Sequence, residues 1–225
     1  IPVKEVRLQI CETLIAFYCE RPPVQQNVQK HRPNSINYNQ MIVEKSDVSE
    51  TLVKSLALME NDLQVRISVL KCLQKLSSKS ESNCMQMLSG QAAGRLCERL
   101  MDSDPSGELL FRSSDILWNL LENGDKNELA RQLNSLTAVR QLQEAFTQQL
   151  TQGYSHYHRQ LRNDLLILAI LVASTCPEAP FVETGFVKQL TLYATFQEVK
   201  SHNAIIKHLK LLQNHEDFEL KKLLI

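Results

Sequence analysis

The stretch MDSDPSGELLFRSSDILWNLLENG, residues 101–124, decides the fold class of this chain. It predicts the end of one helix, a turn at Ser103-Asp104-Pro105, and a long helix that stops at Gly124. Pro105 suits a first helical turn, and the acidic residues beside it suit the positive end of a helix. Apolar residues cover most of the circumference of the long helix: Leu109, Leu110, Phe111, Ile116, Leu117, Trp118, Leu120 and Leu121. A helix of this kind has to be covered by neighbours on several sides.

The neighbours are predicted to be copies of the same unit. Apolar positions of an upstream helix pair recur 44 residues later, where Leu52, Leu56, Leu73 and Leu76 are answered by Leu96, Leu100, Leu117 and Leu120. A third unit follows 46 to 51 residues further on, with Leu142, Phe146, Leu168 and Leu171. The first helix matches at a spacing of 59, where Val6, Ile10, Leu14 and Phe17 precede Val65, Val69, Leu73 and Leu76. A helical unit with this period is typical of armadillo and HEAT repeats.

The predicted fold class is therefore all-α, a right-handed α-solenoid of armadillo/HEAT-like helical repeats. We expect one solenoid fragment over 1–225, with units at about 2–20, 44–90, 91–134, 135–184 and 185–225. The low glycine content, 6 residues, and the abundance of Leu, Gln, Glu and Lys agree with an all-helical chain. The chain begins without Met and ends inside an apolar helical pattern, so we expect it to be part of a longer protein.

Residues 21–43 interrupt the repeat pattern. Pro22-Pro23 ends the first helix, because the residue before a proline is pushed out of helical geometry. The segment is rich in Gln, Asn and Pro, contains no acidic residue, and exceeds the usual length of a connection. We expect a flexible insertion, with an interaction segment as the alternative.

Charge and hydropathy exclude several classes of function. Lys and Arg total 25 and Asp and Glu total 25, so the formal net charge is zero. This balance argues against a nucleic-acid or acidic-membrane binder, which needs a basic surface. The longest apolar run, residues 165–173, is far shorter than the roughly 18 residues of a membrane span. No signal peptide opens the chain, so we expect a soluble intracellular protein.

No residue constellation predicts catalysis, a metal site, a cofactor or a small-molecule substrate. The six cysteines, Cys11, Cys19, Cys72, Cys84, Cys97 and Cys176, form no C-x-x-C pair and are expected as small buried residues in a reducing compartment. His156 and His158 lack a nearby Cys or carboxylate that would complete a metal site. Asp104 and Glu108 are expected as acids at a helix start.

The surface is the remaining source of function. Trp118 is expected in the core because of its helical spacing, and the alternative is an exposed anchor for a partner. A second candidate is the cluster of Tyr154, His156, Tyr157, His158, Arg159 and Arg162, expected in the longest turn between helices. This cluster is either a docking loop for an acidic or aromatic partner or a solvated turn.

The end of the long helix resembles the armadillo family, whose long helices commonly close on the pattern A-L-x-x-L-x-N-L. Residues 117–120, LWNL, fit its last four places. In that family the asparagine, here Asn119, usually binds the backbone of an extended peptide. The equivalent positions are Lys75 and Ile170, so the usual asparagine ladder is absent.

Longer strings resemble the cilia- and flagella-associated protein 69 family. They are DPSGELLFRSSDILWNLLE (104–122), SHYHRQLRNDLLIL (155–168), PEAPFVETGF (177–186), ATFQEVKS (194–201) and HEDFELKKLL (215–224). The resemblance implies a structural protein of the axoneme of motile cilia and sperm flagella, in a C1 projection of the central apparatus. It also implies a role in flagellar assembly and motility and in olfactory cilia.

Two hypotheses follow. The first is a non-enzymatic scaffold that holds other central-apparatus proteins, with microtubule attachment through those proteins, since acidic tubulin tails would require a basic patch. The second is a soluble peptide or cargo adaptor of the armadillo type, which would show a ladder of concave Asn and Trp residues. The sequence offers only Asn119 for that ladder.

Overall fold

The computed structural model describes residues 3–19, 35–59, 61–152 and 156–195 of the chain. Within these ranges every regular element is helical and no strand occurs. The predicted all-α class is therefore confirmed. The chain divides into two compact units, one formed by Ile1–Ala92 with Asp104–Asp125 and the other by Ala93–Ser103 with Lys126–Ile225.

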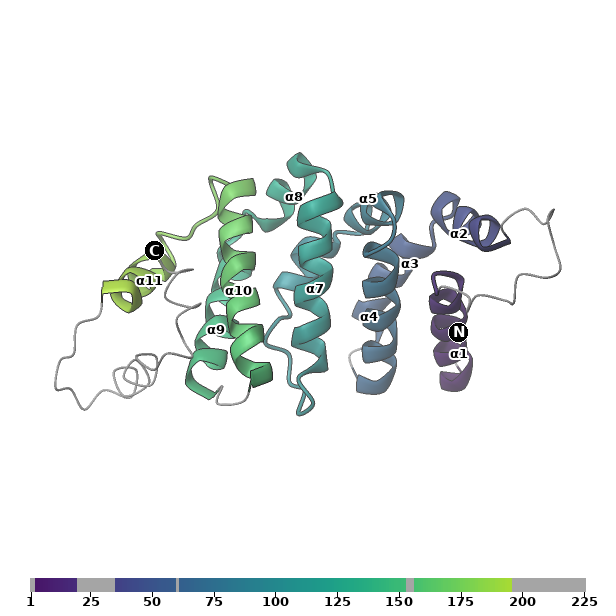
Figure 1. Ribbon diagram of the computed structural model, residues 1–225, viewed down its shortest axis with the longest axis horizontal. Coiled ribbons are helices and arrows are strands. Elements are labelled where there is room, and N and C mark those ends of the chain that lie inside the picture. The colour runs from purple at the N-terminus through teal and green to yellow at the C-terminus, as the bar shows by residue number, and fades with distance from the viewer. Residues whose placement is uncertain (1–2, 20–34, 60, 153–155, 196–225) are drawn as a thin grey trace, which may run out of the picture. The chain divides into compact units, whose positions relative to one another are not determined.

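The first unit contains most of the N-terminal helices. Its elements are α1 (Lys4–Phe17), α2 (Ser35–Lys45), α3 (Val48–Ser55), the short 3-10 helix η1 (Leu56–Leu58), α4 (Leu63–Ser77), α5 (Glu81–Ser89) and α7 (Glu108–Asn123). Helices α1, α4 and α7 lie side by side, with α4 in the middle (Figure 1). Helices α3 and α5 pack against each other and against α4. The long helices thus form one layer and the short helices a second.

Local sequence signals set the starts of these helices. Asp62 caps α4, because its carboxylate accepts a hydrogen bond from the Val65 N–H at 3.1 Å. Ser80 caps α5 in the same way, accepting from the Asn83 N–H at 3.3 Å. Each cap satisfies an N–H group that the helix itself leaves without a partner.

The core of the first unit is made by the apolar positions that recur in the sequence. Leu56, Leu73 and Leu76 are buried, and so are Leu117 and Leu120. Fully burying a leucine side chain stabilises a fold by about 1.5–3 kcal/mol. The recurring leucines are therefore the positions where a polar substitution costs most. The exact limits of the repeat units stay a prediction.

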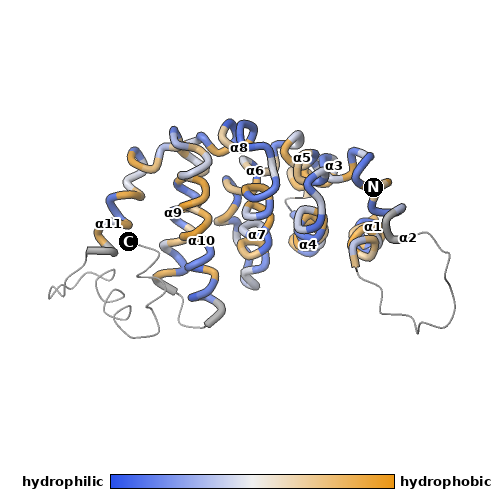
Figure 2. The backbone as a smooth tube through the Cα atoms, turned by 45° about the horizontal axis from the view of Figure 1, so that its top comes forward, coloured by the Kyte–Doolittle hydropathy of each residue, from blue (hydrophilic) through white to orange (hydrophobic). Residues whose placement is uncertain are grey.

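The second unit contains most of α6 (Ala92–Cys97) together with α8 (Lys126–Leu133), α9 (Leu136–Gln152), α10 (His156–Thr175) and α11 (Phe186–Thr195). Helix α10 packs against α8 and α9 and contains the longest apolar stretch, coloured orange in Figure 2. Phe186 is fully buried, with its ring centroid 6.0 Å from that of Phe146 and 5.8 Å from that of Phe181. The contact between Phe146 and Phe186 joins α9 to α11, and Phe181 packs on Phe186 from the segment that precedes α11.

A side chain distant in sequence caps α6. The Gln132 side-chain oxygen accepts hydrogen bonds from the Ala93 N–H at 3.0 Å and the Gly94 N–H at 3.4 Å. Gln132 is buried at the end of α8. A residue with a Cβ at position 94 would approach the Gln132 carbonyl oxygen to 3.3 Å, so glycine permits this close contact.

Several sequence expectations are corrected. Residues 35–43, expected within a flexible insertion over 21–43, belong to helix α2, while residues 20–34 lie outside the described residues. Cys19 is exposed, whereas the other five cysteines are buried as expected. Pro105 precedes α7, which begins at Glu108.

The buried face of α1 also differs from the expected one. Val6 and Ile10, which the repeat spacing matches to Val65 and Val69, are exposed, and Leu14 and Phe17 are half-buried. The residues that α1 buries are Cys11 and the following Tyr18. The apolar stripe read from the sequence is real, but the contact with α4 uses a different side of the helix.

Candidate partner-binding face

Helices α4 and α7 present an accessible face on the side away from their core. We call it the α4–α7 face, made of Lys71, Lys75, Phe111, Asp115, Trp118 and Glu122. Lys71, Phe111 and Glu122 are exposed, while Lys75, Asp115 and Trp118 are half-buried. The residues at helical spacing behind them, such as Leu73 and Leu117, are buried. The face therefore combines basic residues on α4 with acidic and aromatic residues on α7.

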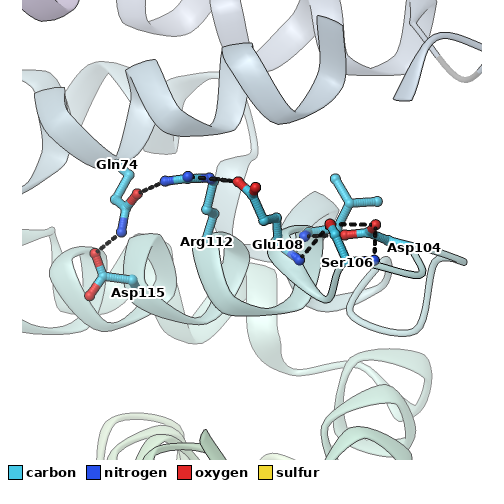
Figure 3. Close-up of polar contacts among 7 residues, drawn as sticks. Gln74, Asp104, Ser106, Glu108, Arg112 and Asp115 are labelled. Atoms are coloured by element: carbon cyan, nitrogen blue, oxygen red, sulfur yellow. Dashed lines mark hydrogen bonds and ion pairs between the residues drawn. The ribbon is translucent and has the colours of Figure 1, made fainter. Parts of the chain in front are cut away.

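A tight turn positions the start of α7 (Figure 3). Gly107 adopts a left-handed conformation, φ 74°, directly before the helix. One carboxylate oxygen of Asp104 accepts from the Ser106 N–H at 2.9 Å and the Ser106 hydroxyl at 2.7 Å. The other accepts from the Leu109 N–H at 2.9 Å. Asp104 thus caps a helix that begins four residues later.

Hydrogen bonding outweighs burial in the pKa of Asp104. Partial burial alone raises this pKa, because it disfavours the charged form. The hydrogen bonds from Leu109, Ser106 and Glu108 stabilise the carboxylate, and the net result is a pKa below the ordinary value. Asp104 therefore acts as a charged cap.

A chain of polar contacts joins α4 to α7 (Figure 3). Within α7, the Arg112 guanidinium pairs with the Glu108 carboxylate at 2.7 Å. Arg112 also donates to the Gln74 side-chain oxygen at 2.6 Å, and the Gln74 amide donates to the Asp115 carboxylate at 2.9 Å. Gln74 of α4 is therefore hydrogen-bonded to both a cation and an anion on α7. Hydrogen bonds to charged groups of this kind contribute about 1.5–3 kcal/mol each when shielded from water, and less at a partly exposed site.

The side chain of Asn119 also forms a contact between α7 and α4. Its side-chain amide donates to the Ser77 hydroxyl at 3.0 Å, and the Ser77 hydroxyl in turn donates to the Gln74 carbonyl at 3.1 Å. Ser77 is buried. The amide that would read a peptide backbone in the armadillo family is here directed toward the neighbouring helix.

Trp118 is neither fully buried, as a core residue would be, nor fully exposed. It lies half-buried on α7, on the accessible side and next to Asn119. Its neighbours Leu117 and Leu120 fill the core instead. Part of the indole is therefore packed and part remains available to a partner.

The structure revises the second sequence candidate. His156, Tyr157, His158, Arg159 and Arg162 lie in helix α10 and not in a turn. Tyr154 lies outside the described residues. Arg162 is only 3% exposed, and its guanidinium donates to the Asn163 side-chain oxygen at 3.2 and 3.1 Å. Arg162 is thus a structural residue, and His158 and Arg159, both half-buried, are the described members left near the surface.

Sequence reasoning missed a buried polar centre at Asn83. Its amide donates to the Tyr18 hydroxyl at 2.9 Å and to the Leu76 carbonyl at 3.4 Å, and its oxygen accepts from the Ser49 hydroxyl at 3.1 Å. Asn83 and Ser49 are both 0% exposed. One side chain therefore links α3, α4, α5 and the end of α1. A lone asparagine in a short helix gives no sequence signal for this role.

Cys84 and Cys97 carry poorly nucleophilic thiols in this fold. Burial raises the pKa of Cys84 and of Cys97 to about 12, so neither carries a thiolate near neutral pH. A hydrogen bond from the Cys72 thiol lowers the pKa of Cys11 to about 7, but Cys11 is itself buried. None of these cysteines is a member of the α4–α7 face.

The described residues show neither a metal site nor a membrane-spanning helix. No three His, Cys, Asp or Glu side chains in this part of the chain gather closely enough to bind a metal ion. None of its helices combines the length and the apolar content needed to cross a bilayer.

Comparison with known proteins decides the family. The model of the armadillo-repeat region of cilia- and flagella-associated protein 69 matches residues 1–225. The chain belongs to the cilia- and flagella-associated protein 69 family. This membership, with the all-α structure, confirms the armadillo-like solenoid class.

Curated relatives carry the same name. The chain is 48% identical over 224 residues to cilia- and flagella-associated protein 69 of Homo sapiens and 45% identical to that of Mus musculus. In both cases the alignment covers 100% of this chain and 24% of the relative. The chain therefore spans about a quarter of the length of these proteins. No solved structure matches the chain.

Proposed function

We propose that this chain is part of a non-enzymatic structural scaffold of the axoneme in motile cilia and flagella. The observation that carries the proposal is the match of all 225 residues to the armadillo-repeat region of a family named for cilia and flagella. We place the scaffold in a C1 projection of the central apparatus, where it supports flagellar assembly and motility. Its partners are other central-apparatus proteins.

The chemistry of the fold supports a scaffold. Stacked repeats distribute their stability along the chain and leave long faces free for partners. In the first unit the helices are joined by specific polar contacts such as Arg112–Gln74–Asp115, which hold the side chains of the α4–α7 face in fixed positions. A face held in this way binds a partner with little loss of conformational freedom.

The alternative, a soluble adaptor that reads extended peptides, has less support. Asn119 donates its amide to Ser77, and the equivalent positions hold Lys75 and Ile170. Such an adaptor needs several amides directed at the peptide backbone. The α4–α7 face offers charged and aromatic side chains in their place.

Fractionation of isolated cilia tests the scaffold directly. After detergent removes the membrane and salt strips the loosely bound proteins, we expect the protein to remain with the axonemal microtubules. Complete release with the soluble matrix would favour the adaptor. Because the net charge is zero, we expect no direct binding of the purified chain to microtubules in a sedimentation assay.

Trp118 tests where partners bind. We expect Trp118→Ala in the full-length protein to increase release from the axoneme, because a half-exposed indole is a typical interface anchor. Met85→Ala is the matched control, since Met85 is an exposed apolar residue on α5 and lies outside the α4–α7 face. Equal retention of both variants would exclude Trp118 as an anchor.

The stability of the same variant separates packing from binding. Truncating a tryptophan in a core costs about 3–5 kcal/mol. Because Trp118 is only half-buried, we expect a smaller loss of unfolding free energy, measured by chemical denaturation. A full core-sized loss would assign any release from the axoneme to unfolding.

A further inference from the structure

Helix α1 carries an apolar stripe that the described chain leaves accessible. The exposed fractions of Val3, Val6 and Ile10 are 49%, 44% and 37%. Leu14 and Phe17 continue the stripe and are half-buried. These residues recur at helical spacing, so they form one continuous side of the helix.

The same stripe is buried in the two equivalent helices. At a spacing of 59, Val6 and Ile10 correspond to Val65 and Val69 of α4, whose exposed fractions are 0% and 1%. A further 44 residues on, the equivalents in α7 are Leu109 and Ser113, which are also buried. The exposure in α1 is therefore an exception within its own repeat series.

The packing of α4 and α7 shows which earlier helices contact a long helix of this series. Two earlier helices pack against α4, the long helix α1 and the short helix α3. Two earlier helices likewise pack against α7, the long helix α4 and the short helix α5. In each case a short helix that comes earlier in the sequence lies against the long helix. Helix α1 packs against α4 and α2, which both follow it, and is the first element of the described chain. No short helix that comes earlier in the sequence contacts α1 among the described residues.

A second exposed stripe lies on the helix that contacts α1. On α2, the exposed fractions of Tyr38, Met41 and Ile42 are 61%, 40% and 49%. The α2 side chain of Gln40 donates to the Phe17 carbonyl at 3.0 Å, which ties the two helices together. A preceding repeat would bury apolar surface on both helices, as neighbouring repeats in a stack do.

We propose that the α1 stripe is an internal repeat interface, covered by a pair of short helices equivalent to α2 and α3. These helices would come from the same polypeptide and complete the repeat whose long helix is α1. The relatives supply the necessary length, since this chain covers only 24% of them. A covering pair in the same polypeptide acts at a high effective concentration, about millimolar for short connections, which favours it over a second molecule.

Cysteine labelling tests the proposal in the full-length protein and in the 1–225 chain. Val6→Cys reports on the stripe, and Gln9→Cys, on the exposed polar side of α1, is the matched control. Both are treated with a maleimide at low protein concentration, and the modified peptides are quantified by mass spectrometry. We expect equal rates at the two positions in the 1–225 chain. In the full-length protein, we expect position 6 to react at least about tenfold more slowly than position 9. The reason is that a buried thiol reacts only through local opening.

Three outcomes would overturn the proposal. One is equal labelling at positions 6 and 9 in the full-length protein. Another is protection of position 6 in the 1–225 chain to the same degree as in the full-length protein. The third is protection that depends on protein concentration in the full-length protein, which would assign the stripe to contact between two copies.

Discussion

Asn83 shows how one polar side chain can organise several helices. It is fully buried, and it hydrogen-bonds Tyr18, Leu76 and Ser49 from three different parts of the first unit. Burial raises the pKa of Tyr18, and the hydrogen bond with Asn83 opposes this effect. The hydroxyl of Tyr18 therefore remains a neutral partner near physiological pH.

We expect Asn83→Ala to destabilise the chain by about 2–3 kcal/mol, because it leaves the buried Ser49 and Tyr18 hydroxyls without this partner. Urea denaturation would show a lower midpoint with an unchanged slope. Asn127→Ala, at an exposed position of α8, is the control and should leave the midpoint in place. Equal midpoints for the two variants would contradict a stabilising role for the hydrogen bonds of Asn83.

Asp104 gives the fold a dependence on pH. Its pKa is lowered in the folded state, since the hydrogen bonds from Leu109 and Ser106 outweigh the opposing effect of burial. A group with a lowered folded pKa contributes stability above its unfolded pKa, about 3.9 for aspartate, and loses it as the pH falls through the folded pKa.

We expect Asp104→Asn to cost about 1 kcal/mol at neutral pH, as the loss of a capping carboxylate does. Thermal unfolding measured from neutral pH downwards should show the variant and the parent chain converging below about pH 4. Glu122→Gln, at an exposed position of α7, the helix that Asp104 caps, is the control. A constant difference at every pH would mean that the charge of Asp104 contributes nothing.

At the scale of a single element, α7 is bounded by two glycines for different reasons. Gly107 has φ 74°, and an added Cβ would meet no atom within 4 Å. Gly124 has φ −90°, an ordinary value, but an added Cβ would lie 2.5 Å from the Leu120 carbonyl oxygen and 2.8 Å from Leu88 Cδ1. Backbone conformation selects glycine at the start of the helix. At the end, the Leu120 carbonyl of α7 and Leu88 of α5 leave no room for a Cβ.

Asparagine at each position separates the two causes. Because asparagine tolerates the left-handed conformation, we expect Gly107→Asn to cost less than about 1 kcal/mol. We expect Gly124→Asn to cost about 1–3 kcal/mol, because Leu88 and the end of α7 have to move apart. Chemical denaturation of both variants would check this order, and the reverse order would contradict the steric argument at Gly124.

At the scale of the whole molecule, exposed apolar side chains on α1 and α2 predict self-association of the 1–225 chain. Val6, Ile10, Tyr38, Met41 and Ile42 are all more than a third exposed. Apolar surface of this kind, when left uncovered, promotes association.

We expect the mass of the 1–225 chain, measured by light scattering after size exclusion, to rise with concentration. The double variant Val6→Glu with Ile10→Glu should shift the chain toward the monomer, since it places charges in the stripe. Gln9→Glu adds charge on the polar side of α1 and is the control. A monodisperse parent chain at high concentration would contradict this prediction.

The sequence by itself determined the all-α class, the period of the repeat and most of the core. Leu73, Leu76, Leu117 and Leu120 are buried as their spacing predicts, because side chains three and four residues apart share one side of a helix. The sequence also predicted the positions of α4 and α7 in the chain to within a few residues. It drew attention to Trp118 and Asn119 on α7.

Only the tertiary structure decided what these side chains do. Periodicity identifies an apolar side but not its cover, so it could not show that Val6 and Ile10 are exposed while Val65 and Val69 are buried. The roles of Asn83, Gln74 and Gln132 depend on partners more than 30 residues away in the chain, as in the contacts with Ser49, Arg112 and Ala93. Hydrogen bonds between distant residues leave no local pattern, since their geometry exists only after the helices have packed.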